Sequence, residues 1–197
     1  IQYNLNRGFL LGHAAAVTHN GRGLAMAGFS GAGKSTLALH IMSLGTTFIS
    51  NDRLMVKRAS KLGMLGVAKL PRINPGTVLA NDSLRTVMPD SDREEVKKLP
   101  VDELWGLEQK YDAFIDQCYG PGKFRLESPM DGLVILNWKR DAGPAKVQQV
   151  DPRERRDLLG AFMKSVGLFY EGPQEGSDPY FSEEAYLDAL AECPMFE

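Results

Sequence analysis

The chain has 197 residues, of which 43% are hydrophobic and 24% are charged. This length and composition predict a single well-buried domain over residues 1–197. The formal net charge is -2, and the lack of a basic excess argues against nucleic acid as a partner. The two cysteines, Cys118 and Cys193, form no metal-binding pattern, so we expect reduced thiols and a cytoplasmic location.

The sequence shows neither a membrane span nor a signal segment. No stretch approaches the roughly 20 consecutive apolar residues that a membrane span needs, and no basic segment followed by an apolar run opens the chain. We therefore expect no membrane partner. The chain begins at Ile1 rather than Met, and we expect it to be a fragment of a longer protein.

The first predicted elements form a hairpin. Phe9 to His19 is a mostly apolar run without helix caps, which predicts a strand. Asn20-Gly21-Arg22-Gly23 supplies the residues that a tight hairpin turn needs. Leu24 to Ala27 should therefore return antiparallel to the first strand.

A phosphate-binding pattern follows the hairpin directly. The residues Gly28-Phe29-Ser30-Gly31-Ala32-Gly33-Lys34-Ser35 fit G-x-x-x-x-G-K-[ST] at every position, and a helix-forming run, Ser35 to Leu44, comes next. Glycines allow the positive φ angles of a loop whose amides converge on an anion. The lysine can reach the outer phosphates of a nucleotide, and the serine can ligate Mg²⁺. The alternative is an ordinary glycine-rich turn between a strand and a helix.

An acidic residue follows the next predicted strand. The helix after the loop should end at Gly45, and Thr46 to Ser50 is β-branched and apolar, which predicts a strand. Asn51-Asp52-Arg53 then places a carboxylate at a strand end that should face the phosphate loop. This is the position of a Walker-B-type acid that holds Mg²⁺.

The remainder of the chain predicts a mixture of strands and helices. We expect first a hairpin of Leu54–Lys57 with Met64–Lys69, then a loop at Pro71–Gly76 and helices at Asp90–Lys98 and Val101–Gln117. Three strands should follow, at Phe124–Glu127, Leu133–Trp138 and Lys146–Val150. The chain should end with a helix that begins at Asp151 and buries residues up to Val166, a Gly/Pro-rich link at Glu171–Pro179, and a last helix from Ser182.

Several of these residues together match a known family. They are His13, Asn20–Gly23, Gly28–Thr36, Ala38–Leu39, Gly45 and Asp52–Arg53. In this stretch the chain resembles the catalytic domain of HPr kinase/phosphorylase, a bacterial protein-serine kinase with a phosphate loop, and above all its HPr-kinase-related relatives. At the family's second signature, Lys69–Thr77 resembles only the related-kinase group.

The resemblance implies the fold that this family shares with phosphoenolpyruvate carboxykinase, a compact α/β domain with a mixed β-sheet. It implies transfer of the γ-phosphoryl group of ATP, assisted by Mg²⁺, to a hydroxyl of a protein serine on an HPr-like carrier or of a small molecule. It also implies a homo-oligomer and, as a further alternative, the reverse phosphorylase reaction.

One residue departs from the family's pattern. The family has two consecutive acids where this chain has Asn51-Asp52, and an amide takes no proton at neutral pH. Either Asp52 serves both the metal and the acceptor, or another residue acts as base, or the chain is a nucleotide-binding regulatory module with weak or lost transfer activity. Phosphoryl transfer depends mainly on positioning and charge neutralisation, so the loss of one base need not abolish it.

The sequence thus yields a set of candidate site residues. His13 matches the family's histidine, although a histidine in an apolar strand is commonly a core residue. Arg72 lies on a loop, where it is either an exposed charge or a group that neutralises phosphate or binds an acidic substrate. The predicted catalytic residues are Lys34, Asp52, His13 and Arg72, the predicted Mg²⁺ ligands are Ser35 and Asp52, and the predicted nucleotide-binding residues are Gly28, Phe29, Ser30, Gly31, Ala32, Gly33, Lys34, Ser35 and Thr36.

Overall fold

The computed structural model describes residues 1–107, 109–137, 143–167 and 181–197. Trp138, the end of one predicted strand, and the predicted link Glu171–Pro179 lie outside the described residues. Within the described ranges, no helix has the length and apolar character that crossing a membrane requires.

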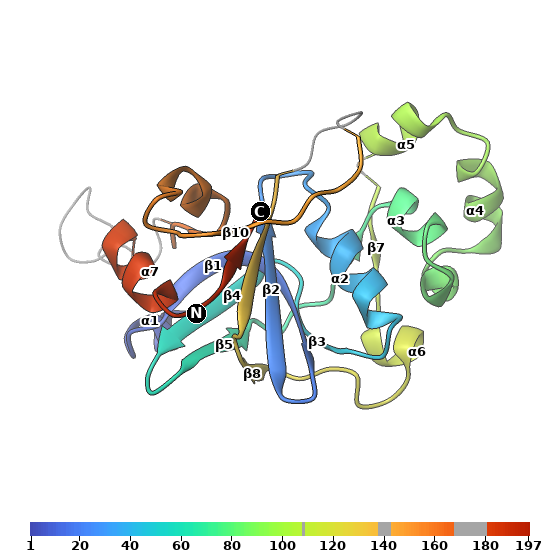
Figure 1. The fold of residues 1–197 in the computed structure, drawn as a ribbon. Helices are drawn as coiled ribbons and strands as arrows, with labels where there is room; N and C mark the ends of the chain where they lie inside the picture. Colours follow the sequence, from blue (N-terminus) through green and yellow to red (C-terminus); the bar gives the residue numbers. More distant parts are fainter. Residues whose placement is uncertain (108, 138–142, 168–180) are drawn as a thin grey trace.

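A nine-stranded mixed sheet forms the centre of the fold (Figure 1). β2 runs antiparallel to β1 and parallel to β9, so the prediction of an α/β fold with a mixed sheet is confirmed. The strands in spatial order are β10 (Gln149–Val150), β11 (Met195–Phe196), β9 (Gly132–Leu136), β2 (Arg22–Gly28), β1 (Leu10–His19), β4 (Arg53–Arg58), β5 (Leu62–Gly66) and β8 (Glu127–Pro129), and β3 (Thr47–Ser50) also pairs with β1.

Short helices surround the sheet. The α-helices are α1 (Gln2–Leu5), α2 (Lys34–Met42), α3 (Pro75–Leu79), α4 (Asp90–Val96), α5 (Val101–Gly106), α6 (Ile115–Tyr119) and α7 (Glu183–Leu190), and two 3-10 helices are η1 (Asp82–Val87) and η2 (Arg156–Ala161). The predicted helices after the phosphate loop, at 90–98 and from Ser182 are confirmed within a few residues. The Ser182 hydroxyl caps α7 by accepting a hydrogen bond from the Ala185 amide.

The hairpin before the phosphate loop is confirmed, and its turn explains the sequence there. Asn20 and Gly21 both have positive φ angles, 49° and 75°. Two consecutive positive φ angles are typical of the two-residue turn whose twist matches that of the flanking strands, and Asn-Gly is the preferred pair for it. The turn sets the register in which β2 delivers the chain to the loop.

β1 changes partner along its length. Its N-terminal part pairs with β4, and its C-terminal part pairs with β3, with a register shift along the β3 ladder. Asn51 and Asp52 are the residues between β3 and β4, where the ladder along this edge of β1 is interrupted. Such an interruption re-aims side chains relative to the regular alternation of a strand. It brings Asp52 beside His13, whose register partner is Arg53.

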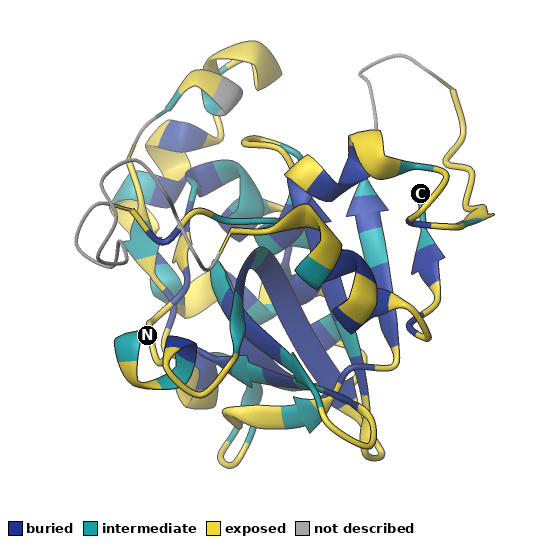
Figure 2. Cartoon of the chain, turned by 90° about the vertical axis from the view of Figure 1, so that its left-hand side faces the viewer, coloured by how far each residue is buried: buried dark blue, intermediate teal, exposed yellow. Residues whose placement is uncertain are grey.

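The two faces of the sheet bury separate cores, and the strands between them are coloured largely as buried in Figure 2. Ala14 and Ala16 contribute to one core together with residues of η2 and α7, whereas Ala15 and Val17 contribute to the other together with residues of α2. This division follows from the alternation of side chains along a strand. The sheet therefore has a helical layer on each side (Figure 1).

Residues 72–107 and 109–119 form a helical cap on the α2 side of the sheet (Figure 1). The predicted loop at Pro71–Gly76 is wrong in part, because β6 (Arg72–Ile73) pairs with β7 (Tyr111–Asp112) and Pro75 begins α3. Proline is tolerated at the first helical position, where its missing N–H would have no partner within the helix. The cap is anchored by Ile73, which is buried in the core beneath α2.

The predicted helix Val101–Gln117 is also wrong in its middle. α5 ends at Gly106 and α6 begins at Ile115, with β7 between them. Pairing with β6 requires an extended backbone, and this tertiary contact overrides the local helix propensity.

Three further predictions, one helix and two strands, are wrong in part in the second half of the chain. Asp151 does cap the following turn by accepting from the Arg153 amide at 2.8 Å, but the described residues there contain only the 3-10 helix η2 rather than the predicted α-helix. The strand predicted at Phe124–Glu127 begins only at Glu127, and the strand predicted at Lys146–Val150 is confined to its last two residues. Short ladders at the two ends of the sheet account for both differences.

Candidate functional site

The phosphate loop, residues 28–35, joins the end of β2 to the start of α2. Gly31 and Gly33 have φ angles of 81° and 84°. Only glycine adopts this region at little cost, so the backbone of the loop depends on the residue type that the pattern supplies. The first amides of α2 have no partner within the helix, and the positive end of the helix dipole adds to their attraction for anions.

Lys34 is buried at the base of the loop, with 8% of the residue exposed. Its ammonium donates to the carbonyl oxygens of Gly28 at 2.7 Å and Phe29 at 3.2 Å. Burial lowers the pKa of Lys34, and the nearby negative charge of Asp52 acts in the opposite direction. The loop thus holds a cation at the point where a bound phosphate would need one.

Asp52 lies at the centre of a second cluster, the Asp52 cluster, which contains Asp52, His13, Arg53 and Lys69. Asp52 Oδ1 is 3.2 Å from His13 Nε2, and its Oδ2 is 3.7 Å from Arg53 Nε and 3.9 Å from Lys69 Nζ. The hydrogen bond from His13 lowers the pKa of Asp52 to about 2, with the charges of Arg53 and Lys69 adding to the shift and burial opposing it. The carboxylate is therefore ionised at neutral pH.

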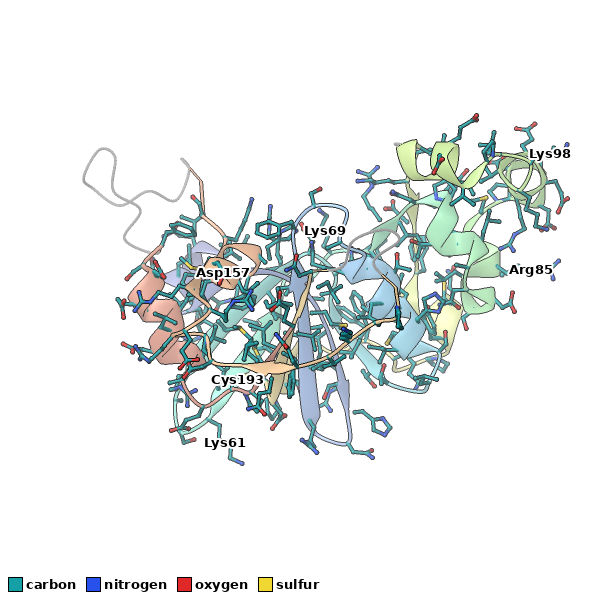
Figure 3. The ribbon with its side chains drawn as sticks, turned by 45° about the horizontal axis from the view of Figure 1, so that its top comes forward. Lys61, Lys69, Arg85, Lys98, Asp157 and Cys193 are labelled. Carbon is teal, nitrogen blue, oxygen red and sulfur yellow. The ribbon has the colours of Figure 1, made fainter. Side chains whose placement is uncertain are left out.

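Three segments of the chain assemble this cluster. His13 comes from β1, Asp52 and Arg53 from the junction of β3 and β4, and Lys69 from the segment after β5. The Arg53 carbonyl accepts from the Val67 amide at 3.2 Å, which holds the segment after β5 against the junction. In Figure 3, Lys69 lies near the loop that follows β2.

A pocket of about 730 Å³ opens over the phosphate loop. One side is formed by loop and helix residues from Gly31 to His40, and the other by residues of the helical cap, including Arg72, Thr77 and Lys110. The Thr36 and Thr77 hydroxyls share a hydrogen bond of 2.8 Å, which ties α2 to α3 beneath the pocket. Its volume is in the range of about 300–1,000 Å³ that is usual for small-molecule sites.

The structure brings the predicted site residues together in two groups. Arg72 and the residues from Gly31 to Thr36 line the pocket, while His13 and Asp52 belong to the Asp52 cluster. Lys34 joins the groups, because it lines the pocket and its charge interacts with Asp52. Gly28 carries the carbonyl that holds Lys34, and Phe29 and Ser30 are exposed on the loop.

Some residues of the site were missed or undervalued by sequence reasoning. His40 lines the pocket but was not among the predicted site residues, and its spacing of four from Thr36 places both on one face of α2. That spacing is the signal that could have identified it. Lys110 had no such signal, because it approaches the pocket only through the pairing of β7 with β6.

Comparisons with known proteins give limited information. No family model matches the sequence, and no curated protein matches it. Among solved structures, the HPr(Ser) kinase/phosphatase from Coxiella burnetii is similar in fold, with a TM-score of 0.44 and 12% sequence identity over 78% of this chain and 81% of that chain. A likeness of this size concerns the course of the backbone, and the functional interpretation rests on this chain's own residues.

Proposed function

We propose that this chain is an ATP-dependent kinase of the HPr-kinase type, with the P-loop fold of HPr kinase and phosphoenolpyruvate carboxykinase, that transfers the γ-phosphoryl group to a hydroxyl. The observation that carries the proposal is the position of Lys34. Its buried ammonium lies in a glycine loop, lines a pocket of about 730 Å³ and interacts with the ionised Asp52 carboxylate. A loop, a lysine and an acid in this relation are the parts that phosphoryl transfer requires.

The nucleotide phosphates would be bound by the amides of the phosphate loop and the start of α2. Lys34 would exchange its contacts with the Gly28 and Phe29 carbonyls for the β- and γ-phosphate oxygens. The acceptor oxygen bonds to the γ-phosphorus as the bond to the bridging oxygen of ADP breaks. ADP leaves with that electron pair, and the hydroxyl proton passes to solvent.

The donor set beside the loop fits Mg²⁺. Mg²⁺ is usually bound through one or two carboxylates together with substrate phosphates and waters rather than by a cage of protein ligands. Among the described residues, no group of three or more His, Cys, Asp or Glu could hold a metal alone. The Ser35 hydroxyl and the Asp52 carboxylate would be the ligands, and the ion would neutralise charge on the β- and γ-phosphates.

A buried oxygen on the residue before Asp52 supports a ligand there. Asn51 Oδ1 is buried and has no hydrogen-bond partner among the residues that the structure describes. A buried acceptor without a partner costs free energy, so such an atom is a candidate contact for a bound water, ion or hydroxyl. Asn51, His13 and Arg72 are the residues that we assign to arranging the acceptor.

The test is a phosphate-transfer assay with labelled ATP and a binding titration with Mg-ATP. We expect saturable binding, and transfer to a protein serine or a small hydroxyl compound. Lys34→Ala should abolish both, whereas Lys61→Ala, which removes an exposed lysine on the β4–β5 turn, should change neither. Unchanged affinity of Lys34→Ala for Mg-ATP would remove the basis of the proposal.

The alternative is a nucleotide-binding regulatory module, and the amide at position 51 favours it. An amide next to Asp52 provides no second carboxylate for the acceptor or the metal. If this reading holds, wild-type protein binds Mg-ATP without measurable transfer, and Asn51→Asp raises transfer strongly. Robust transfer by the wild type excludes it.

A further inference from the structure

The cap side of the pocket is cationic. Arg72 and Lys110 of the cap both line the pocket, and no Asp or Glu is among the pocket's lining residues in the described part of the chain. The loop side contributes Lys34. Because positive side chains line both the loop side and the cap side of the pocket, the pocket attracts ligands that carry more than one negative group.

Arg72 is held in place rather than carried on a free loop. Its strand β6 pairs with β7, where Asp112 is the register partner of Arg72. The distance from Arg72 Nε to Asp112 Oδ1 is 3.5 Å. The Ala113 amide donates to the Pro71 carbonyl at 2.9 Å and closes the same pairing. Because Lys110 directly precedes β7, this ribbon holds both cations at one wall.

The β7 strand is itself fixed to the cap. The Tyr111 hydroxyl donates to Asp92 of α4 at 3.0 Å. Ile73, the register partner of Tyr111 on β6, is buried at 2% exposure. A guanidinium has five N–H donors, so its contact with Asp112 through Nε leaves donors for a ligand. The ribbon therefore fixes the backbone from which the Arg72 side chain, 60% exposed, extends with donors left for a ligand.

The nucleotide does not need these two cations. Its phosphates are served by the loop amides, Lys34 and Mg²⁺ in the proposed function. Arg72 and Lys110 come from a different part of the chain and line the same cavity. Because Arg72 and Lys110 are not needed for the triphosphate, they indicate that a second anionic group occupies the pocket together with the nucleotide.

We propose that the acceptor is a small hydroxyl compound that carries an anionic oxygen group, a carboxylate or a phosphate, and that Arg72 and Lys110 bind this group. The inference rests on the proposed function and names its substrate class. The fork of an arginine matches the two oxygens of such a group. A pocket of about 730 Å³ is sized for a small molecule rather than for a serine on the surface of a folded carrier protein.

The first experiment tests the anion subsite with inorganic phosphate as the probe. Phosphate is titrated into protein already saturated with Mg²⁺ and a non-hydrolysable ATP analogue, so that the phosphate loop is blocked. We expect saturable binding that Arg72→Gln and Lys110→Gln each weaken about tenfold. Lys98→Gln is the matched control, because Lys98 is an exposed cap lysine outside the pocket lining and far from Lys69 in Figure 3.

Three results overturn the subsite. They are the absence of saturable phosphate binding, an equal loss in Lys98→Gln, and a loss of nucleotide affinity rather than phosphate affinity in Arg72→Gln. In the last case the two cations belong to the nucleotide. Failure of the ATP analogue itself to bind overturns the proposed function as well, so the two failures are distinguishable.

The second experiment tests the acceptor class with labelled ATP. Glycerol, glycerate, glycerol 3-phosphate and an unmodified serine peptide are compared as acceptors. We expect transfer to glycerate or glycerol 3-phosphate at least about tenfold above glycerol, with Arg72→Gln raising KM for the acid more than it lowers kcat. Equal transfer to glycerol, or a preference for the peptide, contradicts the inference and leaves the kinase proposal intact.

Discussion

Lys34 and Asp52 lie close enough for their charges to interact, yet they are held by different kinds of contact. Lys34 is bound by main-chain carbonyls of its own loop, no more than six residues away in sequence. Asp52 is surrounded by side chains from β1, from its own neighbour and from the segment after β5. The phosphate loop is therefore a local structure of the backbone, whereas the Asp52 cluster exists only in the folded sheet.

This difference predicts separate roles for the two regions, with nucleotide binding by the phosphate loop and phosphoryl transfer by the Asp52 cluster. A loop built from backbone amides and a buried lysine suits the binding of phosphates, which every nucleotide carries. An ionised carboxylate, held in position by side chains from three segments, suits the placement of a metal ion or an acceptor, which acts during transfer. Variants of the two regions should therefore separate binding from transfer.

After the loss expected for Lys34→Ala, the largest expected effect is that of Asp52→Asn on transfer. The substitution keeps the shape of the side chain but removes the charge that we assign to Mg²⁺, so kcat should fall by about 100-fold or more. Affinity for ATP without Mg²⁺ should change by less than about threefold, because the loop contacts remain intact. Transfer kinetics check the fall in kcat, and ATP titrations with and without Mg²⁺ check the affinities. An equal loss of ATP affinity with and without Mg²⁺ would contradict the separation of binding from transfer.

The next effect concerns the backbone of the loop. Gly31→Ala should destabilise the chain by about 1–2 kcal/mol, because the backbone φ of 81° is one that an L side chain rarely adopts. Steric overlap does not contribute, since an added Cβ at this position meets open space. Gly76→Ala in α3 is the matched control: an added Cβ there also meets open space and no positive φ is involved, so it should stabilise by about 0.5–1 kcal/mol. Urea unfolding measures both, and equal effects would show that loop strain is not the cause.

A smaller effect is the pH dependence that Asp52 contributes. Its pKa in the folded state, about 2, is below the unfolded value of 3.8, so its stabilisation is present above about pH 4 and is lost as pH falls toward 2. After allowance for solvent screening it amounts to about 1 kcal/mol. The stability difference between wild type and Asp52→Asn, from urea unfolding, should be constant near neutral pH and shrink below about pH 4. A difference that persisted unchanged to about pH 2 would mean that uncharged contacts cause it.

The two regions also differ in how far the sequence could predict them. The loop, the hairpin before it and the helix after it follow from contiguous residues, and the Asn20-Gly21 turn and the glycines at positive φ confirm the local reasoning. Asp52 was found because it ends a predicted strand. Its neighbours His13 and Arg53 are brought together by strand register, which pairs the two residues and which composition does not show.

The cap shows the same limit more strongly. The helix predicted at Val101–Gln117 was too long, because β7 pairs with β6 across about 40 residues of chain. Local propensity for helix at Tyr111–Asp112 loses to this pairing and to the burial of Ile73. Since Arg72 and Lys110 meet only through that ribbon, the cationic wall of the pocket could not be predicted from spacing.

The smallest expected effect is that of Lys69→Gln on stability. Lys69 is 3.9 Å from Asp52, but its side chain is 58% exposed, so the pair should contribute less than about 0.5 kcal/mol. Urea unfolding should show this loss at low salt and none at about 1 M salt, where exposed charges are screened. Lys61→Gln is the control, since Lys61 is exposed on the β4–β5 turn away from the cluster. A larger, salt-independent loss in Lys69→Gln would show that Lys69 supports the cluster through packing, and the Asp52 region would then be less dependent on charge than its distances indicate.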